Sequence, residues 1–125
     1  MYILNVEDDV FKHQAIAKAI HRQFDDVSIE WEKNLEDAMN KIALQEENGK
    51  PFDIIITDMW YPKSHNGAEE ESGLELISML REANSDIPII VCSSVKYRLD
   101  NVAGCVRYSS DSDWEYDLFE LISFL

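Results

Sequence analysis

Acidic side chains follow two short apolar runs of the chain. Asp58 comes directly after residues 52–57, and the triplet Glu7-Asp8-Asp9 comes after residues 2–6. Carboxylates that lie close together repel one another, and a cation must offset this repulsion. Mg²⁺ is the natural candidate, because it prefers carboxylate, carbonyl and water oxygens and keeps positions open for a phosphate. If the two runs are neighbouring strands, the sequence predicts a magnesium site where they end.

A carboxylate beside Mg²⁺ can also attack a phosphoryl group and form an acyl phosphate. Asp58 is the candidate nucleophile, and Ser93 and Ser94, after a further apolar run, offer hydroxyl donors to the added oxygens. A simpler hypothesis is that the acidic triplet only caps a helix, where negative charge interacts well with the helix dipole. Capping accounts for one member of the triplet, but it does not account for Asp58 after a strand of Ile and Thr. The pattern therefore favours a metal and phosphoryl site over helix capping alone.

Five short apolar runs have the length and composition of buried strands. They span residues 2–6, 27–31, 52–57, 87–92 and 104–108. Segments with helical spacing lie between and after them, and their apolar positions are Phe11, Ala15, Ile16, Ala19 and Ile20; Leu35, Ala38, Met39 and Ile42; Leu74, Ile77 and Leu80; and Leu118, Leu121, Ile122 and Leu125. Each set covers one helix face. This alternation predicts a parallel sheet with helices on both faces, because right-handed crossovers pack back onto the sheet.

The boundaries of these elements carry their own signals. Asn34 and Ser72 stand where helix N-caps are expected. Residues 59–72 are polar and irregular, and they form a long connection for a strand followed by a helix. Only eleven residues, 93–103, separate the fourth and fifth runs, which leaves room for at most a short helix.

Composition limits the classes of function. A chain of 125 residues is the usual size of one domain, and its 25 acidic against 11 basic residues give a formal net charge of −14. Such a surface repels nucleic acid and anionic lipid, and it favours a protein partner with a basic patch. No apolar stretch approaches the roughly 20 residues of a membrane span, and no basic segment opens the chain, so we expect a cytoplasmic protein. Cys92 and Cys105 lie in apolar segments and are expected to be reduced thiols.

Taken in order, these motifs resemble the receiver domain of bacterial response regulators over essentially the whole chain. ILNVEDD is similar to the first strand and acidic pair of that family, and FDIIITDMWYP is similar to its phosphoacceptor strand and following loop. SGLELISMLR resembles its third helix, and IPIIVCSS resembles its fourth strand with a switch hydroxyl. The resemblance implies a doubly wound α/β fold with a five-stranded parallel sheet in the CheY-like, or flavodoxin-like, order 2-1-3-4-5. The short stretch of residues 93–103 departs from that family and implies a shortened fourth helix.

The resemblance implies a metal site as well. Asp8 would bind Mg²⁺ directly, Glu7 would be its acidic partner through water, and Asp58 and the backbone carbonyl of Trp60 would complete the set. The acidic pair could instead be Asp8 with Asp9. Asp8 belongs to both arrangements.

The same resemblance implies that Asp58 is the phosphoacceptor and Ser93 the switch hydroxyl. The family also has a Lys-Pro pair at the end of its fifth strand, and the ammonium of that lysine neutralises a phosphoryl oxygen. This chain has the sequence VRYSS at residues 106–110 and lacks that lysine. Arg107 could replace it only if strand alternation turned its side chain into the site. Lys96 is a second candidate.

Two functions follow from this pattern. The first is a stand-alone receiver without an output domain, which accepts a phosphoryl group from a histidine kinase or phosphotransfer protein and signals through protein contacts. The second is a pseudo-receiver, an adaptor module that does not depend on phosphorylation. A homodimer is compatible with either. We do not expect an enzyme, since aspartate phosphatases need an Asp-x-Asp spacing that Glu7-Asp8-Asp9 lacks.

Overall fold

Five parallel strands form the central sheet in the order β2-β1-β3-β6-β7. The computed structural model describes all residues from Met1 to Leu125. The strands are β1 (Tyr2–Val6), β2 (Ser28–Glu32), β3 (Ile54–Thr57), β6 (Ile89–Ser93) and β7 (Gly104–Arg107). This arrangement confirms the predicted sheet and its strand order. It also makes β1 and β3 direct neighbours, with Val6 paired to Thr57 at their carboxyl ends.

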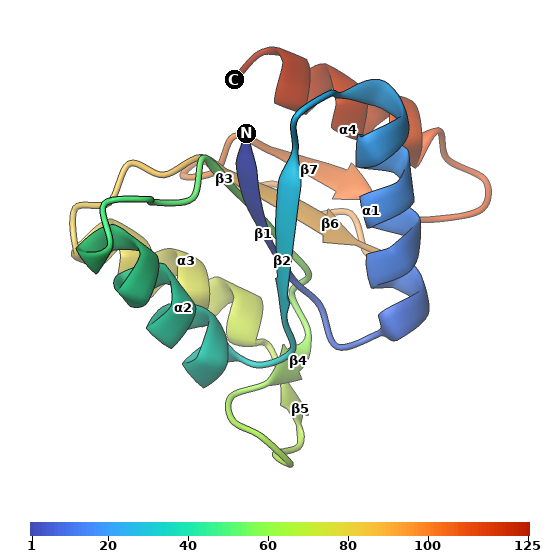
Figure 1. The fold of residues 1–125 in the computed structure, drawn as a ribbon. Helices are drawn as coiled ribbons and strands as arrows, with labels where there is room; N and C mark the ends of the chain where they lie inside the picture. The colour runs from blue at the N-terminus through green and yellow to red at the C-terminus, as the bar shows by residue number, and fades with distance from the viewer.

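Four helices cover the sheet, two on each face (Figure 1). They are α1 (Val10–Gln23), α2 (Leu35–Glu47), α3 (Ser72–Glu82) and α4 (Trp114–Ser123). Alternation along β3 divides the core, because Ile55 packs in the cluster with α2 and α3 while Ile54 and Ile56 pack in the cluster with α1 and α4. None of these helices is both long and apolar enough to cross a membrane.

The stretch between β6 and β7 contains no helix. The reduction of the fourth helix therefore goes further than the sequence predicted. Three apolar side chains of this stretch, Tyr97, Leu99 and Val102, pack instead against the core on the α2 and α3 face. Their spacing of two and then three residues does not form a continuous helical stripe, which explains why an irregular chain covers this part of the sheet.

Residues 59–72 contain a small hairpin instead of an irregular loop. β4 (Tyr61–Pro62) pairs antiparallel with β5 (Glu69–Glu70), and the hairpin projects from the edge of the fold where β1 and β3 end (Figure 1). Tyr61 anchors it, because its side chain is fully buried in the core beside α2 and α3. The hairpin therefore has a fixed position next to the acidic residues.

The predicted N-cap is correct at Asn34 and wrong at Ser72. Asn34 accepts a hydrogen bond from the Asp37 amide at 2.8 Å. Ser72 is already the first residue of α3, and its hydroxyl donates to the Tyr61 carbonyl at 2.6 Å. The hairpin supplied this competing acceptor, and it cannot be identified from the local sequence.

Asn34→Ala is expected to lower the free energy of unfolding by about 1 kcal/mol, because it removes the side-chain cap of α2. Urea unfolding followed by circular dichroism measures the change. Asn34→Ser is the control, since a serine oxygen can accept the same amide hydrogen and should recover most of the loss. An equal loss in both variants would contradict a capping role.

The two cysteines are free thiols. Cys92 is buried, and burial raises the pKa of its thiol to about 12. This agrees with the predicted reduced state, and the high pKa leaves Cys92 without thiolate reactivity near neutral pH.

Candidate functional site

A cleft opens at the carboxyl ends of β1, β3 and β6. It brings together seven of the residues predicted from the sequence, which are Glu7, Asp8, Asp9, Asp58, Trp60, Ser93 and Ser94. Lys12, Glu69 and Tyr108 also line it. The location agrees with the general rule that open parallel sheets bind ligands where the strands end.

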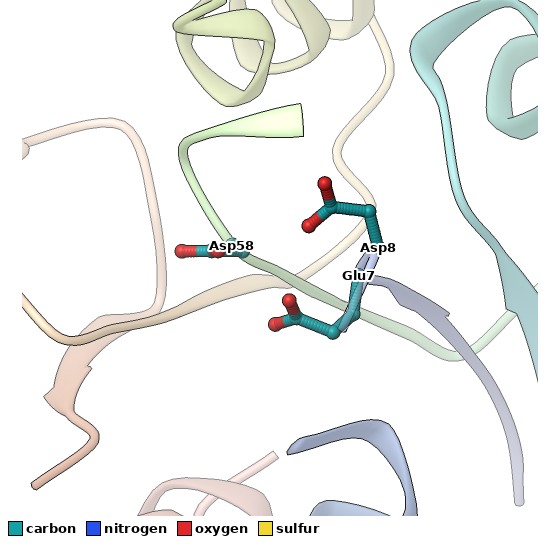
Figure 2. Close-up of side chains that lie close together, drawn as sticks. All are labelled: Glu7, Asp8 and Asp58. Atoms are coloured by element: carbon teal, nitrogen blue, oxygen red, sulfur yellow. The ribbon is translucent and has the colours of Figure 1, made fainter. Parts of the chain in front are cut away.

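Three carboxylates lie together in this cleft. Glu7 and Asp8 follow β1, Asp58 follows β3, and one oxygen from each lies within 4.8 Å of the others. Figure 2 shows the three side chains gathered where the two strands end. The parallel pairing is responsible, because the Asp58 amide donates to the Val6 carbonyl at 3.0 Å and extends the strand pair to the acidic residues.

Asp9 has a separate role as the N-cap of α1. Its carboxylate accepts hydrogen bonds from the amides of Phe11 at 2.9 Å and Lys12 at 3.3 Å. The capping hypothesis is therefore correct for this one member of the acidic triplet. Of the two acidic pairs that the sequence left open, Glu7 with Asp8 is the one that joins Asp58 in the cluster.

The cluster carries unbalanced negative charge. Burial raises the pKa of Glu7, the Asp58 carboxylate raises it further, and the Lys12 ammonium acts in the opposite direction. Burial also raises the pKa of Asp8 to about 6, and a hydrogen bond with Glu69 adds to that rise. Proteins in which carboxylates meet in this way hold a cation between them or keep one carboxyl group protonated.

The donor set fits a hard divalent cation. Glu7 is 1% exposed, and its buried Oε1 atom accepts no hydrogen bond, although the Lys12 ammonium lies beside it. Asp8 and Asp58 are only half-buried, so they can reach a cation that also keeps water ligands. Carboxylate oxygens of this kind are what Mg²⁺ prefers.

The sequence of the chain matches a known protein family. Residues 3–108 match the response regulator receiver domain. The chain belongs to this family. Receiver domains act in phosphorelay signalling, in which they are phosphoacceptors. The comparison with curated protein sequences gave no match.

Solved structures share the fold of this receiver. A two-component response regulator from Cytophaga hutchinsonii is 18% identical with a TM-score of 0.72, and the match covers 98% of this chain and 96% of that one. A DNA-binding response regulator of the LuxR family from Staphylococcus aureus is 24% identical with a TM-score of 0.70 and the same two coverages, 98% and 96%. The phosphorylated cyanobacterial phytochrome response regulator RcpA is 18% identical with a TM-score of 0.70, covering 98% of this chain and 89% of that one. At these identities the likeness concerns the fold.

The receiver holds a buried lysine in its cleft that the sequence analysis missed. Lys12 comes from the first turn of α1 and is 7% exposed. Its ammonium lies 2.9 Å from Glu7 Oε1 and 3.4 Å from Asp58 Oδ1, and it donates to the Cys92 carbonyl at 2.7 Å. Burial opposes the charged form, but the nearby Glu7 and Asp58 carboxylates raise the pKa of Lys12, so the ammonium stays protonated.

Neither predicted replacement for the family lysine reaches the cleft. Arg107 on β7 pairs with Ser93 on β6. The Arg107 side chain is exposed, and Val106 beside it takes the buried position. Strand alternation thus turns Arg107 away from the site, which corrects that prediction. Lys96 is also exposed and does not line the cleft.

Trp60 links the hairpin to the stretch that follows β6. Its side chain is 43% exposed, and its indole N–H donates to the Tyr97 hydroxyl at 3.1 Å. That hydroxyl in turn donates to Glu71 at 3.0 Å. Side-chain hydrogen bonds therefore join the hairpin to the stretch after β6, and Trp60 lines the cleft, where its indole can report on ligands.

Proposed function

We propose that Asp58 accepts a phosphoryl group from a histidine kinase or a phosphotransfer protein, with Mg²⁺ present, and that the chain signals through protein contacts. The observation that carries this proposal is the cluster of Glu7, Asp8 and Asp58 in a cleft that also holds the Ser93 hydroxyl. A carboxylate nucleophile, a cation site and a hydroxyl donor are the parts that an acyl phosphate needs.

The two oxygens of Asp58 differ in their surroundings. Oδ1 accepts a hydrogen bond from the Met59 amide at 2.8 Å and faces Lys12, whereas Oδ2 accepts no hydrogen bond. Oδ2 is therefore the candidate nucleophile. Its lone pair forms the bond to phosphorus, the phosphorus–nitrogen bond of the donor phosphohistidine breaks, and the electron pair of that bond returns to the imidazole nitrogen. The products are an aspartyl phosphate and a histidine.

Residues of this chain would hold the metal and position the phosphoryl group. Asp8, Asp58, the Trp60 backbone carbonyl and, through water, Glu7 would bind Mg²⁺, which supplies positive charge to neutralise the phosphoryl oxygens. Ser93 is 1% exposed, and its oxygen accepts from the Val95 amide at 3.3 Å, so its hydroxyl hydrogen is free to donate into the cleft. The phosphorylated state of RcpA, whose fold this chain shares, supports the proposal by likeness.

Beryllofluoride, a phosphoryl mimic, tests the proposal in the wild-type chain and in Asp58→Asn. We expect Mg²⁺ followed by beryllofluoride to change the tryptophan fluorescence of the wild type, because Trp60 lines the cleft. The variant should lose the beryllofluoride response because it lacks the carboxylate that the mimic must join. Asp86→Asn is the control, since it removes an equal charge at an exposed position outside the cleft. A wild-type chain that responds to neither ligand would reject phosphoryl acceptance.

A pseudo-receiver that acts as an adaptor without phosphorylation is the second candidate. It is favoured by one observation, that Tyr108 and Ser109 follow β7 and that residues 106–110 contain no lysine. A silent wild type in the fluorescence experiment would support this candidate. Under either function, the net charge of −14 favours a partner with a basic patch, and association that does not weaken with salt would contradict that choice of partner.

A further inference from the structure

The cleft has an ammonium group although β7 supplies none. Tyr108 directly follows β7, and Arg107 is turned outward. Lys12 reaches the same cleft from α1, and its Nζ atom lies 5.3 Å from the centre of the Tyr108 ring. An aromatic face at this distance stabilises a cation. The segment in which the family resemblance implies a lysine thus has no lysine, and its aromatic side chain Tyr108 supports a lysine that comes from a helix.

Groups on or directly after three strands hold the Lys12 ammonium in position. It contacts Glu7 after β1, Asp58 after β3 and the Cys92 carbonyl on β6. One of these contacts is a hydrogen bond to a carbonyl, and the other two are ion pairs with carboxylates. The contact to Asp58 is the longest of the three, at 3.4 Å against 2.9 Å and 2.7 Å. It is the contact that is most easily exchanged for a new acceptor.

A phosphoryl group on Asp58 would offer that acceptor. The ammonium already faces Oδ1 of the carboxylate. A group bonded to Oδ2 of the same carboxylate lies next to Oδ1, within reach of a lysine side chain with its flexible four-carbon stem. The group also adds negative charge in a partly buried cleft, where charge-assisted hydrogen bonds are strong.

We propose that Lys12, from α1, pairs with a phosphoryl oxygen on Asp58 and so replaces the absent lysine of β7. This inference rests on the proposed function. A structural alternative is that Lys12 only balances the buried Glu7 carboxylate. The two roles differ in their effect on ligand binding. A lysine that pairs with the phosphoryl group strengthens binding of an anion at Asp58, whereas a counter-charge for Glu7 is needed whether or not an anion is bound.

The test compares Lys12→Met, Lys12→Arg and Lys18→Met in the full chain. Lys18→Met is the matched control, since Lys18 is an exposed lysine on the same helix. Binding of Mg²⁺ alone and of beryllofluoride in saturating Mg²⁺ is measured by tryptophan fluorescence, and the folded state by circular dichroism. We expect Lys12→Met to weaken beryllofluoride binding by about 10- to 100-fold. Its Mg²⁺ affinity should be at least that of the wild type, because an ammonium repels a metal cation.

Lys12→Arg should retain most of the beryllofluoride affinity, and Lys18→Met all of it. Wild-type affinity in Lys12→Met would overturn the role of Lys12 and leave phosphoryl acceptance intact. Parallel loss of Mg²⁺ and beryllofluoride binding would also overturn it, since that result indicates a damaged site. A wild type that binds no beryllofluoride would instead reject the proposed function itself, and the inference with it.

A second measurement is made on the wild-type chain, so it tests the proposal even if Lys12→Met does not fold. Nitrogen-15 spectra of the lysine ammonium groups are recorded for the wild type, and the Lys12 signal is assigned by its absence in Lys12→Arg. Beryllofluoride in saturating Mg²⁺ should shift the Lys12 signal and leave the Lys18 signal in place. A Lys12 signal that does not move while Trp60 reports binding would overturn the proposal.

Discussion

Gly73→Ala is expected to lower the free energy of unfolding by about 3 kcal/mol. An added Cβ atom at Gly73 would lie 2.4 Å from the Asp58 carbonyl oxygen and 2.7 Å from the Met59 Cα atom. Both are backbone atoms and cannot rotate away, and the Gly73 amide also donates to the Met59 carbonyl at 3.0 Å. Either α3 or the turn after β3 must therefore move. Urea unfolding measures the loss of stability.

The same substitution should weaken beryllofluoride binding, because the displaced turn carries the phosphoacceptor. Gly104→Ala is the matched control. Its Cβ atom would meet the side chain of Leu121 at 2.6 Å, and a leucine side chain can change rotamer. We expect a stability loss of at most about 1 kcal/mol there and unchanged ligand binding. Equal losses in the two variants would show that the close approach of α3 to Asp58 does not matter.

Leu76→Ala is expected to lower the free energy of unfolding by about 2–5 kcal/mol. Leu76 on α3 is fully buried in the core beside β1 and β3, so its truncation leaves a cavity that the packed sheet cannot close. A domain of this size has a total stability of roughly 5–15 kcal/mol, so this single change removes a large part of it.

Leu44→Ala tests whether burial is the cause of that loss. Leu44 lies on α2 and is 49% exposed, so both variants make the same change within a helix and differ in what surrounds the side chain. Both Leu and Ala are strong helix formers, and we expect a change within about 0.5 kcal/mol for Leu44→Ala. Urea unfolding of the two variants measures the difference. Comparable losses would contradict a core centred on Leu76.

The strands and the acidic cluster could be predicted from the sequence because each depends on a local pattern. The run Ile54-Ile55-Ile56 is apolar on both faces, as a central strand must be, and the carboxylates follow the strands directly. Parallel pairing then brings Asp58 beside Glu7 and Asp8 without further information. The hairpin could not be predicted, since it depends on Tyr61 packing into a core that other elements build.

Lys12 was not recognised from the sequence because its neighbour Phe11 is the apolar residue of the pair. The sequence analysis placed Phe11 on the inner face of α1, yet Phe11 is 78% exposed and Lys12 is 7% exposed. The signal was present in the spacing, since Ile16 and Ile20 define a row of positions four residues apart whose next member is Lys12. The acidic triplet just before Lys12 supplies the partner that allows a charged residue to occupy this buried row.

The helical origin of Lys12 changes which mutations the site can tolerate. The ammonium and two of the three carboxylates of the cluster lie within one short segment, Glu7 to Lys12. Inserting or deleting one residue between Asp9 and Lys12 would rotate the lysine by about 100° around the helix axis and carry it out of the cleft. In this receiver the charge balance around Asp58 depends on the rotational phase of α1.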